Sequence, residues 1–228
     1  MIRHHLTDEL LMAYSAGTLP EAFNLVVATH VSLCDACRAR LESFDAVGGA
    51  LLEETRPAAA MSQGALADTM RRIKAEATSQ CGGDTMPPAT RRSEAPDPAH
   101  RTGLFPAPLA EYVGGDLDAV TWRSVGGGVR QAILPTSAQA SARLLLIPGG
   151  VAVPDHGHHG TEITLVLKGA FQDEHDRFGP GDIEIATEET HHTPVAEVGD
   201  DCICLAVTDA PLKFRGLLPR LAQPFFRI

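Results

Sequence analysis

The first 80 residues place apolar side chains at helical spacing. Thr7 is suited to cap a first helix, and Asp8 and Glu9 suit its positive end. Gly17 can end this helix in a left-handed conformation. The pattern then predicts three further helices, over about 20–33, from about 35 to beyond 52, and over about 64–77. We therefore predict a four-helix domain over residues 1–80.

The stretch from Cys81 to Pro108 has neither a helical nor an alternating apolar period, and it is rich in proline. Such a composition is typical of a linker. We therefore predict a Pro- and Gly-rich linker over residues 81–105, followed by a second domain over residues 106–228.

The second domain consists of short β-rich runs that Gly and Pro turns separate. Its candidate strands are Ala119–Arg123, Val129–Leu134, Ala142–Ile147, Glu162–Leu167, Ile183–Ala186 and Cys202–Val207. Many short strands at roughly even spacing favour a sandwich or a barrel. The predicted fold class is thus α+β, with two domains.

Composition and charge argue against some classes of function. The 228 residues carry a formal net charge of −10, which argues against direct DNA binding because that requires clustered Lys and Arg. No apolar run approaches the roughly 18 residues of a membrane span, and no signal peptide precedes the first amphipathic pattern. We therefore expect a cytoplasmic protein, in which the clustered 10 His and 5 Cys indicate metal sites before disulfides.

A first candidate metal site lies where the second helix ends. His30 and Cys34 are one helical turn apart, and Cys37 follows at the C-x2-C spacing that brings two thiolates to one zinc ion. A closed structural zinc site needs four ligands, so a fourth must come from elsewhere. His5 is the first candidate, and His4 is the alternative.

A second candidate metal site lies in the β-rich domain. His156 and His158 are two residues apart, so their side chains share one face of an extended segment. Glu162 opens the next strand, and His192 completes a set of three histidines and one carboxylate. Such a set suits zinc or another divalent transition metal. Alternation turns the neighbouring His159 and His191 to the opposite side.

The spacing Gly150-x5-His156-x-His158-x3-Glu162-x6-Gly169 resembles the first motif of the cupin superfamily. His192 resembles the histidine of the second cupin motif, although Thr193-Pro194 follows it in place of the usual asparagine. The resemblance covers roughly residues 106–228. It implies a small jelly-roll β-barrel with the metal inside.

The helical domain with its H-x3-C-x2-C motif resembles the zinc-dependent anti-sigma domains, and joined to a cupin it closely resembles the ChrR-type anti-sigma factors. The resemblance spans nearly the whole chain. It implies that the N-terminal domain sequesters an extracytoplasmic-function sigma factor from RNA polymerase, and that the cupin domain senses singlet oxygen or related oxidative stress and triggers release. In that family an N-terminal histidine is the fourth zinc ligand, which matches His5.

The sequence leaves several alternatives open. A metal-dependent cupin enzyme, a dioxygenase or an isomerase with an accessory zinc module, is the rival to a non-catalytic regulator. Cys202 and Cys204 alternate on a predicted strand, so they are either core residues or an oxidisable pair. The sequence also leaves open whether a protease completes the release of the sigma factor.

Overall fold

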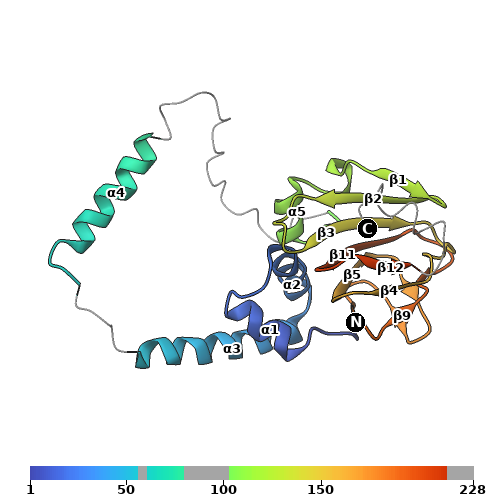
Figure 1. Ribbon diagram of the computed structural model, residues 1–228, viewed down its shortest axis with the longest axis horizontal. Helices are drawn as coiled ribbons and strands as arrows, with labels where there is room; N and C mark the ends of the chain where they lie inside the picture. The colour runs from blue at the N-terminus through green and yellow to red at the C-terminus, as the bar shows by residue number, and fades with distance from the viewer. Residues whose placement is uncertain (56–60, 80–102, 215–228) are drawn as a thin grey trace. The chain divides into compact units, whose positions relative to one another are not determined.

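The computed structural model describes residues 1–55, 61–79 and 103–214 (Figure 1). Of these residues, 1–49 and 103–214 belong to one compact unit, and 50–55 and 61–79 belong to a second. Most of the predicted linker and Cys81 lie outside the described residues, so the division at residues 80 and 105 stays a prediction. Within the described residues, no helix combines the length and the apolar character needed to cross a membrane.

The N-terminal helices follow the predicted pattern closely. They are α1 (Asp8–Ser15), α2 (Glu21–Leu33), α3 (Asp35–Glu54) and α4 (Ala65–Ser79). The Thr7 side chain accepts a hydrogen bond from the Leu10 amide at 3.3 Å, as expected for an N-cap. A further helix, α5 (Ala107–Val113), was not predicted. Its seven residues follow a proline-rich stretch and are too few to show a helical period.

Twelve short strands form the β domain, which we define as residues 123–214. They are β1 (Arg123–Gly126), β2 (Val129–Leu134), β3 (Ser141–Ile147), β4 (His156–His158), β5 (Glu162–Lys168), β6 (Phe171–Gln172), β7 (Arg177–Phe178), β8 (Ile183–Ala186), β9 (His191–His192), β10 (Val195–Ala196), β11 (Cys202–Thr208) and β12 (Leu212–Phe214). The largest sheet has the order β1-β2-β3-β11-β5-β8, and two three-stranded sheets have the orders β10-β6-β7 and β12-β4-β9.

One predicted strand is wrong. Residues Ala119–Arg123 do not form a strand; instead a 3₁₀ turn covers Leu117–Ala119 and β1 begins at Arg123. The side chain of Asp116 accepts a hydrogen bond from the Leu117 amide at 2.6 Å and thereby caps the 3₁₀ turn. This local side-chain contact competes with extended structure.

The central strands of the six-stranded sheet are buried on both faces. All seven residues of β11 are buried, and five consecutive residues of β5 are buried as well. On one face Leu205 shares a hydrophobic core with Val26 of α2 and Leu109 of α5. On the other face Cys204 packs in a separate cluster with Phe171 of β6. The sheet therefore separates a helix-covered core from the interior of the β domain.

Helix α2 is the N-terminal helix that packs against the β domain. It contacts β3, β5, β11 and α5, all within the compact unit (Figure 1). Its residues Val26 and Val27 are fully buried. The end of α2 is thereby brought next to the turn between β7 and β8, where His30 meets the β domain.

Truncation of Leu205, which is fully buried on the central strand, should destabilise the protein. We expect Leu205→Ala to lower the free energy of unfolding by about 2–5 kcal/mol, because it leaves a cavity between the sheet and the helices. Val198→Ala is the control, since Val198 is exposed, and it should change the free energy by less than about 0.5 kcal/mol. Urea denaturation of both variants measures this difference; equal midpoints would contradict the packing described here.

Candidate metal centres

Four side chains from three segments converge at the N-terminal site. His5 precedes α1, His30 lies in the last turn of α2, Cys34 ends α2, and Cys37 lies in the first turn of α3. One donor atom from each lies within 4.8 Å of the other three. Nδ1 of His5 is 3.3 Å from Sγ of Cys34, and Nε2 of His30 is 3.3 Å from Sγ of Cys37. Tetrahedral zinc sites separate their ligands by about 3.5 Å, so these donors fit such an ion.

His5 rather than His4 belongs to this group. Successive residues of the extended N-terminal segment point in opposite directions. The ring of His4 packs against Phe178 with centroids 4.6 Å apart, and its Nε2 lies 3.7 Å from a carboxylate oxygen of Asp176. The geometry therefore distinguishes the two histidines that the sequence leaves open.

The electrostatics of this group favour metal binding over protonation. Burial lowers the pKa of His30 to about 4, so its imidazole is neutral near pH 7. Burial raises the pKa of Cys37, so its thiol is held in the protonated form until a cation stabilises the thiolate. Nδ1 of His30 donates to the carbonyl oxygen of Gly181 at 3.0 Å, which leaves Nε2 free of hydrogen and directed at Cys37.

Three histidines converge in the β domain. β4 supplies His156 and His158, and β9, which pairs with β4, places His192 directly opposite His156. Nε2 of His192 lies 3.2 Å from Nε2 of His156 and 3.4 Å from Nε2 of His158. All three side chains are buried, and their converging imidazole nitrogens fit a divalent transition metal.

The fourth predicted ligand, Glu162, lies beside this cluster rather than within it. Its Oε2 is 3.9 Å from Nδ1 of His158, at the start of β5. Burial and the neighbouring Glu184 raise the pKa of Glu162 to about 7. A cation among the histidines would favour the ionised carboxylate, and its role as a ligand stays a prediction.

Two carboxylates that sequence analysis missed hold the His192 ring. Nδ1 of His192 lies 2.7 Å from Oε1 of Glu184 and 3.2 Å from Oδ2 of Asp173. A carboxylate on the far nitrogen of a histidine ligand fixes its orientation and raises its basicity. Glu184 lies between Ile183 and Ile185 on a predicted strand, and such alternation by itself places a carboxylate on the solvent face, so no sequence pattern indicated that it is buried. Asp173 lies in the hairpin between β6 and β7, and no sequence pattern there indicates that it lies near His192.

The neighbouring histidines and cysteines are placed as predicted. His159 and His191 are both exposed, on the opposite side from the buried cluster. Cys202 and Cys204 are both buried on one face of β11, with their Sγ atoms 3.5 Å apart. The two sulfurs lie in the apolar core of the β domain.

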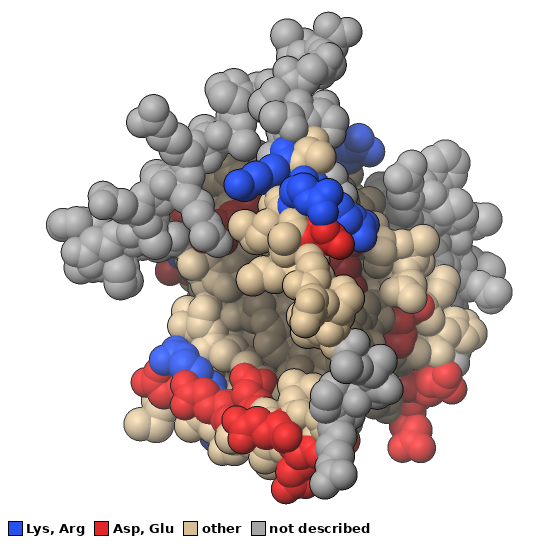
Figure 2. All heavy atoms as spheres, turned by 90° about the vertical axis from the view of Figure 1, so that its left-hand side faces the viewer, with Lys and Arg blue, Asp and Glu red and all other residues tan. Residues whose placement is uncertain are grey.

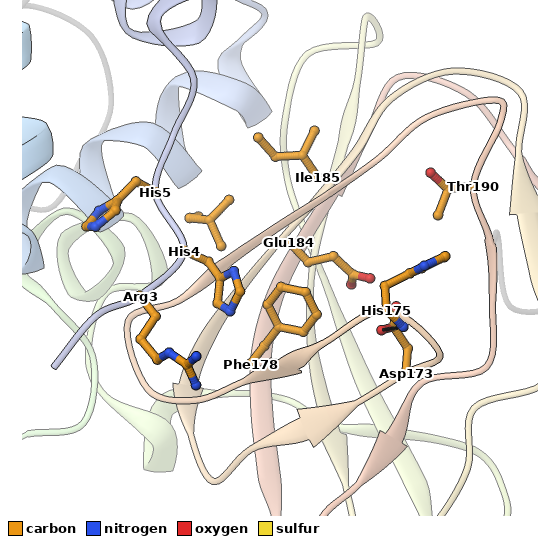
Figure 3. Close-up of a pocket in the computed structure, with 10 residues that line it drawn as sticks. Arg3, His4, His5, Asp173, His175, Phe178, Glu184, Ile185 and Thr190 are labelled. Atoms are coloured by element: carbon orange, nitrogen blue, oxygen red, sulfur yellow. Dashed lines mark hydrogen bonds between the residues drawn. The ribbon is translucent and has the colours of Figure 1, made fainter.

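A pocket of about 560 Å³ lies between the N-terminal segment and the β domain (Figure 3). Arg3, His4 and His5 line one part of it, and Asp173, His175 and Glu184 line another. The pocket therefore borders one residue of the first cluster and both carboxylates behind His192 in the second cluster. The two candidate metal centres are close neighbours in the compact unit.

Comparison with known proteins gives one family match and two similarities to individual proteins. Residues 111–211 match the family described as ChrR Cupin-like domain. The chain is 61% identical over 228 residues to Anti-sigma-E factor ChrR from Cereibacter sphaeroides, a match that covers 100% of this chain and 99% of that protein. It is also similar to a chain of the crystal structure of Rhodobacter sphaeroides SigE in complex with the anti-sigma ChrR, with 59% identity, a TM-score of 0.75, and coverage of 92% of this chain and 100% of that chain.

Metal binding at the histidine cluster should depend steeply on pH. Burial opposes protonation of His192, but its hydrogen bonds to Glu184 and Asp173 outweigh burial and raise its pKa to about 9. Below that pH a bound metal must displace the proton, so the apparent Zn²⁺ affinity should rise about tenfold per pH unit toward pH 9. Chelator competition between pH 6 and 9 measures this slope.

Glu184→Gln is the matched variant for this prediction. It removes the charge that holds the proton on His192, so the slope should become shallower while Zn²⁺ still binds. A Zn²⁺ affinity that does not change with pH in the unmodified protein would contradict the proton displacement.

Proposed function

We propose that this chain, which belongs to the ChrR family of anti-sigma factors, sequesters an extracytoplasmic-function sigma factor and keeps it from RNA polymerase. The observation that carries the proposal is the 61% identity to Anti-sigma-E factor ChrR over the full chain. The complex of SigE with the anti-sigma ChrR supports a sigma factor as the partner here too. The chain then acts in the cytoplasm as a negative regulator of transcription, without binding DNA itself.

The N-terminal group of His5, His30, Cys34 and Cys37 would hold Zn²⁺ as a closed structural site. Its four donors leave no position for substrate, so this ion contributes stability rather than chemistry. It would join the segment before α1, the end of α2 and the start of α3. The zinc ion thereby maintains the helical surface that binds the sigma factor.

Exposed apolar side chains on the helices supply a surface for that partner. On α4 the side chains of Leu66, Met70 and Ile73 lie at spacings of four and three residues, so they share one helix face. Leu66 is 72% exposed and Ile73 is 54% exposed. The second half of α3 likewise exposes Val47, Leu51 and Leu52. Exposed apolar faces of this kind indicate a protein interface, and we assign them to the sigma factor.

The charges of the helices favour the same type of partner. Figure 2 shows Asp and Glu side chains gathered in a band on the face that it draws, and Lys and Arg side chains gathered in a group. The exposed acidic residues of α3 are Asp35, Glu42, Asp45, Glu53 and Glu54. A negative surface complements the basic DNA-binding region of a sigma factor and speeds their association.

The β domain would sense the oxidant through its metal centre. His156, His158 and His192, together with Glu162, would hold Zn²⁺ or another divalent transition metal. The buried cluster next to an accessible pocket suits a sensor of a small diffusing molecule, and the resemblance identifies singlet oxygen or related oxidative stress as the signal. We infer a regulator rather than a cupin enzyme, since the similar full-length proteins are described as anti-sigma factors.

Zinc-dependent sigma factor binding is tested by co-purification with the cognate sigma factor. We expect Cys34→Ala and Cys37→Ala to lose binding, because each removes a ligand of the closed site. Leu66→Ser combined with Ile73→Ser should weaken binding at least about tenfold, since apolar contacts are lost. Val198→Ser is the control, because Val198 is an exposed apolar residue of the β domain. If the unmodified protein does not bind the sigma factor, or if the cysteine variants bind as tightly, the zinc-dependent function is wrong.

The sensing role is tested with His156→Ala combined with Glu162→Ala. This variant should still bind the sigma factor but should not release it under singlet oxygen, because the metal centre of the β domain is lost. His159→Ala is the matched control, since His159 is adjacent in sequence but exposed. Release is followed by transcription from a promoter that depends on the sigma factor. Normal release by the double variant would exclude this metal centre from signalling.

A further inference from the structure

The β domain contributes a direct contact to the N-terminal metal cluster. The carbonyl oxygen of Gly181, in the turn between β7 and β8, accepts the hydrogen bond from Nδ1 of His30 at 3.0 Å. Both partners are buried. This hydrogen bond fixes which nitrogen of His30 faces Cys37, so an atom of the β domain orients a ligand of the other centre.

The same turn also holds the backbone that presents His5. Oδ1 of the buried Asp182 accepts hydrogen bonds from the amides of Arg3 at 2.6 Å and His4 at 3.0 Å. The Ile183 amide donates to the carbonyl oxygen of His4 at 3.2 Å. Three hydrogen bonds thus immobilise the two residues before His5.

Close packing leaves this turn little freedom to move. A Cβ on Gly181 would lie 2.6 Å from Cδ1 of Ile2, and the φ of +87° at Gly181 is one that other residues rarely adopt. The turn is also tied to β5, because the Gly181 amide donates to the carbonyl oxygen of Val166 at 2.8 Å. Its position is therefore set by the sheet.

Strand β8 continues from this turn to the histidine cluster. Glu184 is two residues after Asp182, and its Oε1 is 2.7 Å from Nδ1 of His192. In Figure 3 the Glu184 carboxylate lies on the Asp173 side of the pocket, whereas His4 and His5 come from the N-terminal segment on the other side. The turn and the strand that follows it thus contact one residue of each cluster, His30 through Gly181 and His192 through Glu184.

We propose that the turn Gly179–Ile183 of the β domain positions the ligands of the N-terminal metal site, and that β8 couples the metal affinities of the two sites. The inference rests on the N-terminal zinc site proposed above. Asp182 is a positioning residue, since it acts through the backbone before His5. By thermodynamic linkage, metal bound at the first site alters the metal affinity of the second by the same factor as metal bound at the second site alters the affinity of the first.

The test uses the full-length chain, freed of metal and titrated with Co²⁺. Thiolate ligation gives Co²⁺ an absorption band that imidazole and carboxylate ligands do not, and its loss in Cys37→Ser assigns the band to the N-terminal site. If the unmodified chain gives no such band, the zinc site and this inference are both wrong. If the band is present, Zn²⁺ competition against it reports the affinity of this site alone.

Asp182→Ala should weaken metal binding at the N-terminal site about 10- to 100-fold and alter the cobalt band. Asp182→Asn should restore part of the affinity, because its amide oxygen still accepts from the amides of Arg3 and His4, whereas its NH2 group cannot accept from the Gly179 amide as Oδ2 of Asp182 does. Asp209→Ala is the matched control: Oδ1 of Asp209 accepts from the Thr161 amide at 2.9 Å in a loop of the β domain. It should leave the affinity and the band unchanged.

Arg3→Pro keeps the test valid if Asp182→Ala does not fold. It removes one amide that donates to Asp182, in an exposed residue outside the β domain. It should also weaken metal binding at the N-terminal site. If both Asp182→Ala and Arg3→Pro fold and retain the affinity and the band of the unmodified chain, the turn has no positioning role.

The coupling through β8 is tested with His192→Ala. Removing this histidine should lower the metal affinity of the N-terminal site at least about fivefold. The same substitution should have no further effect when Asp182→Ala is already present, because the connection is then broken. An unchanged N-terminal affinity in His192→Ala, or an equal effect in both backgrounds, would overturn the coupling.

Discussion

Burial of the central strands of the six-stranded sheet on both faces is the constraint on which the rest of the structure depends. Strand β11 has no exposed residue, so its apolar side chains need partners on two sides. The smaller sheets cover one face, and helices α2 and α5 cover the other. Helices α2 and α5 therefore share a hydrophobic core with the β domain.

This docking brings together two candidate metal centres of different character. The first centre has two thiols and two imidazoles, which come from three segments of the helical region. The second is built on paired strands, with carboxylates behind one of its histidines. Strand β8 and the turn before it touch both. A regulator that must convert a chemical event in one domain into release by another would use such a contact.

Much of both candidate sites could be predicted from the spacing of residues in the sequence. The H-x3-C-x2-C motif and the pair His156 and His158 were identified from helix and strand periodicity, and the structure brings each group together. The inferred resemblance to ChrR-type anti-sigma factors is confirmed by identity over the full chain. The strands of two or three residues and helix α5 were missed, because elements so short carry no period. The strand predicted at Ala119–Arg123 was wrong, since capping by Asp116 favours a 3₁₀ turn.

The sequence by itself determined the ligand types, the helices that carry them and the α+β class, because each depends on neighbours within a few residues. Only the tertiary structure decided that His5 rather than His4 joins the cysteines and that Asp173 and Glu184 hold His192. It alone revealed that Gly181, some 150 residues away along the chain, orients His30. Contacts between distant segments depend on how the buried faces fit together, and no local pattern records that fit.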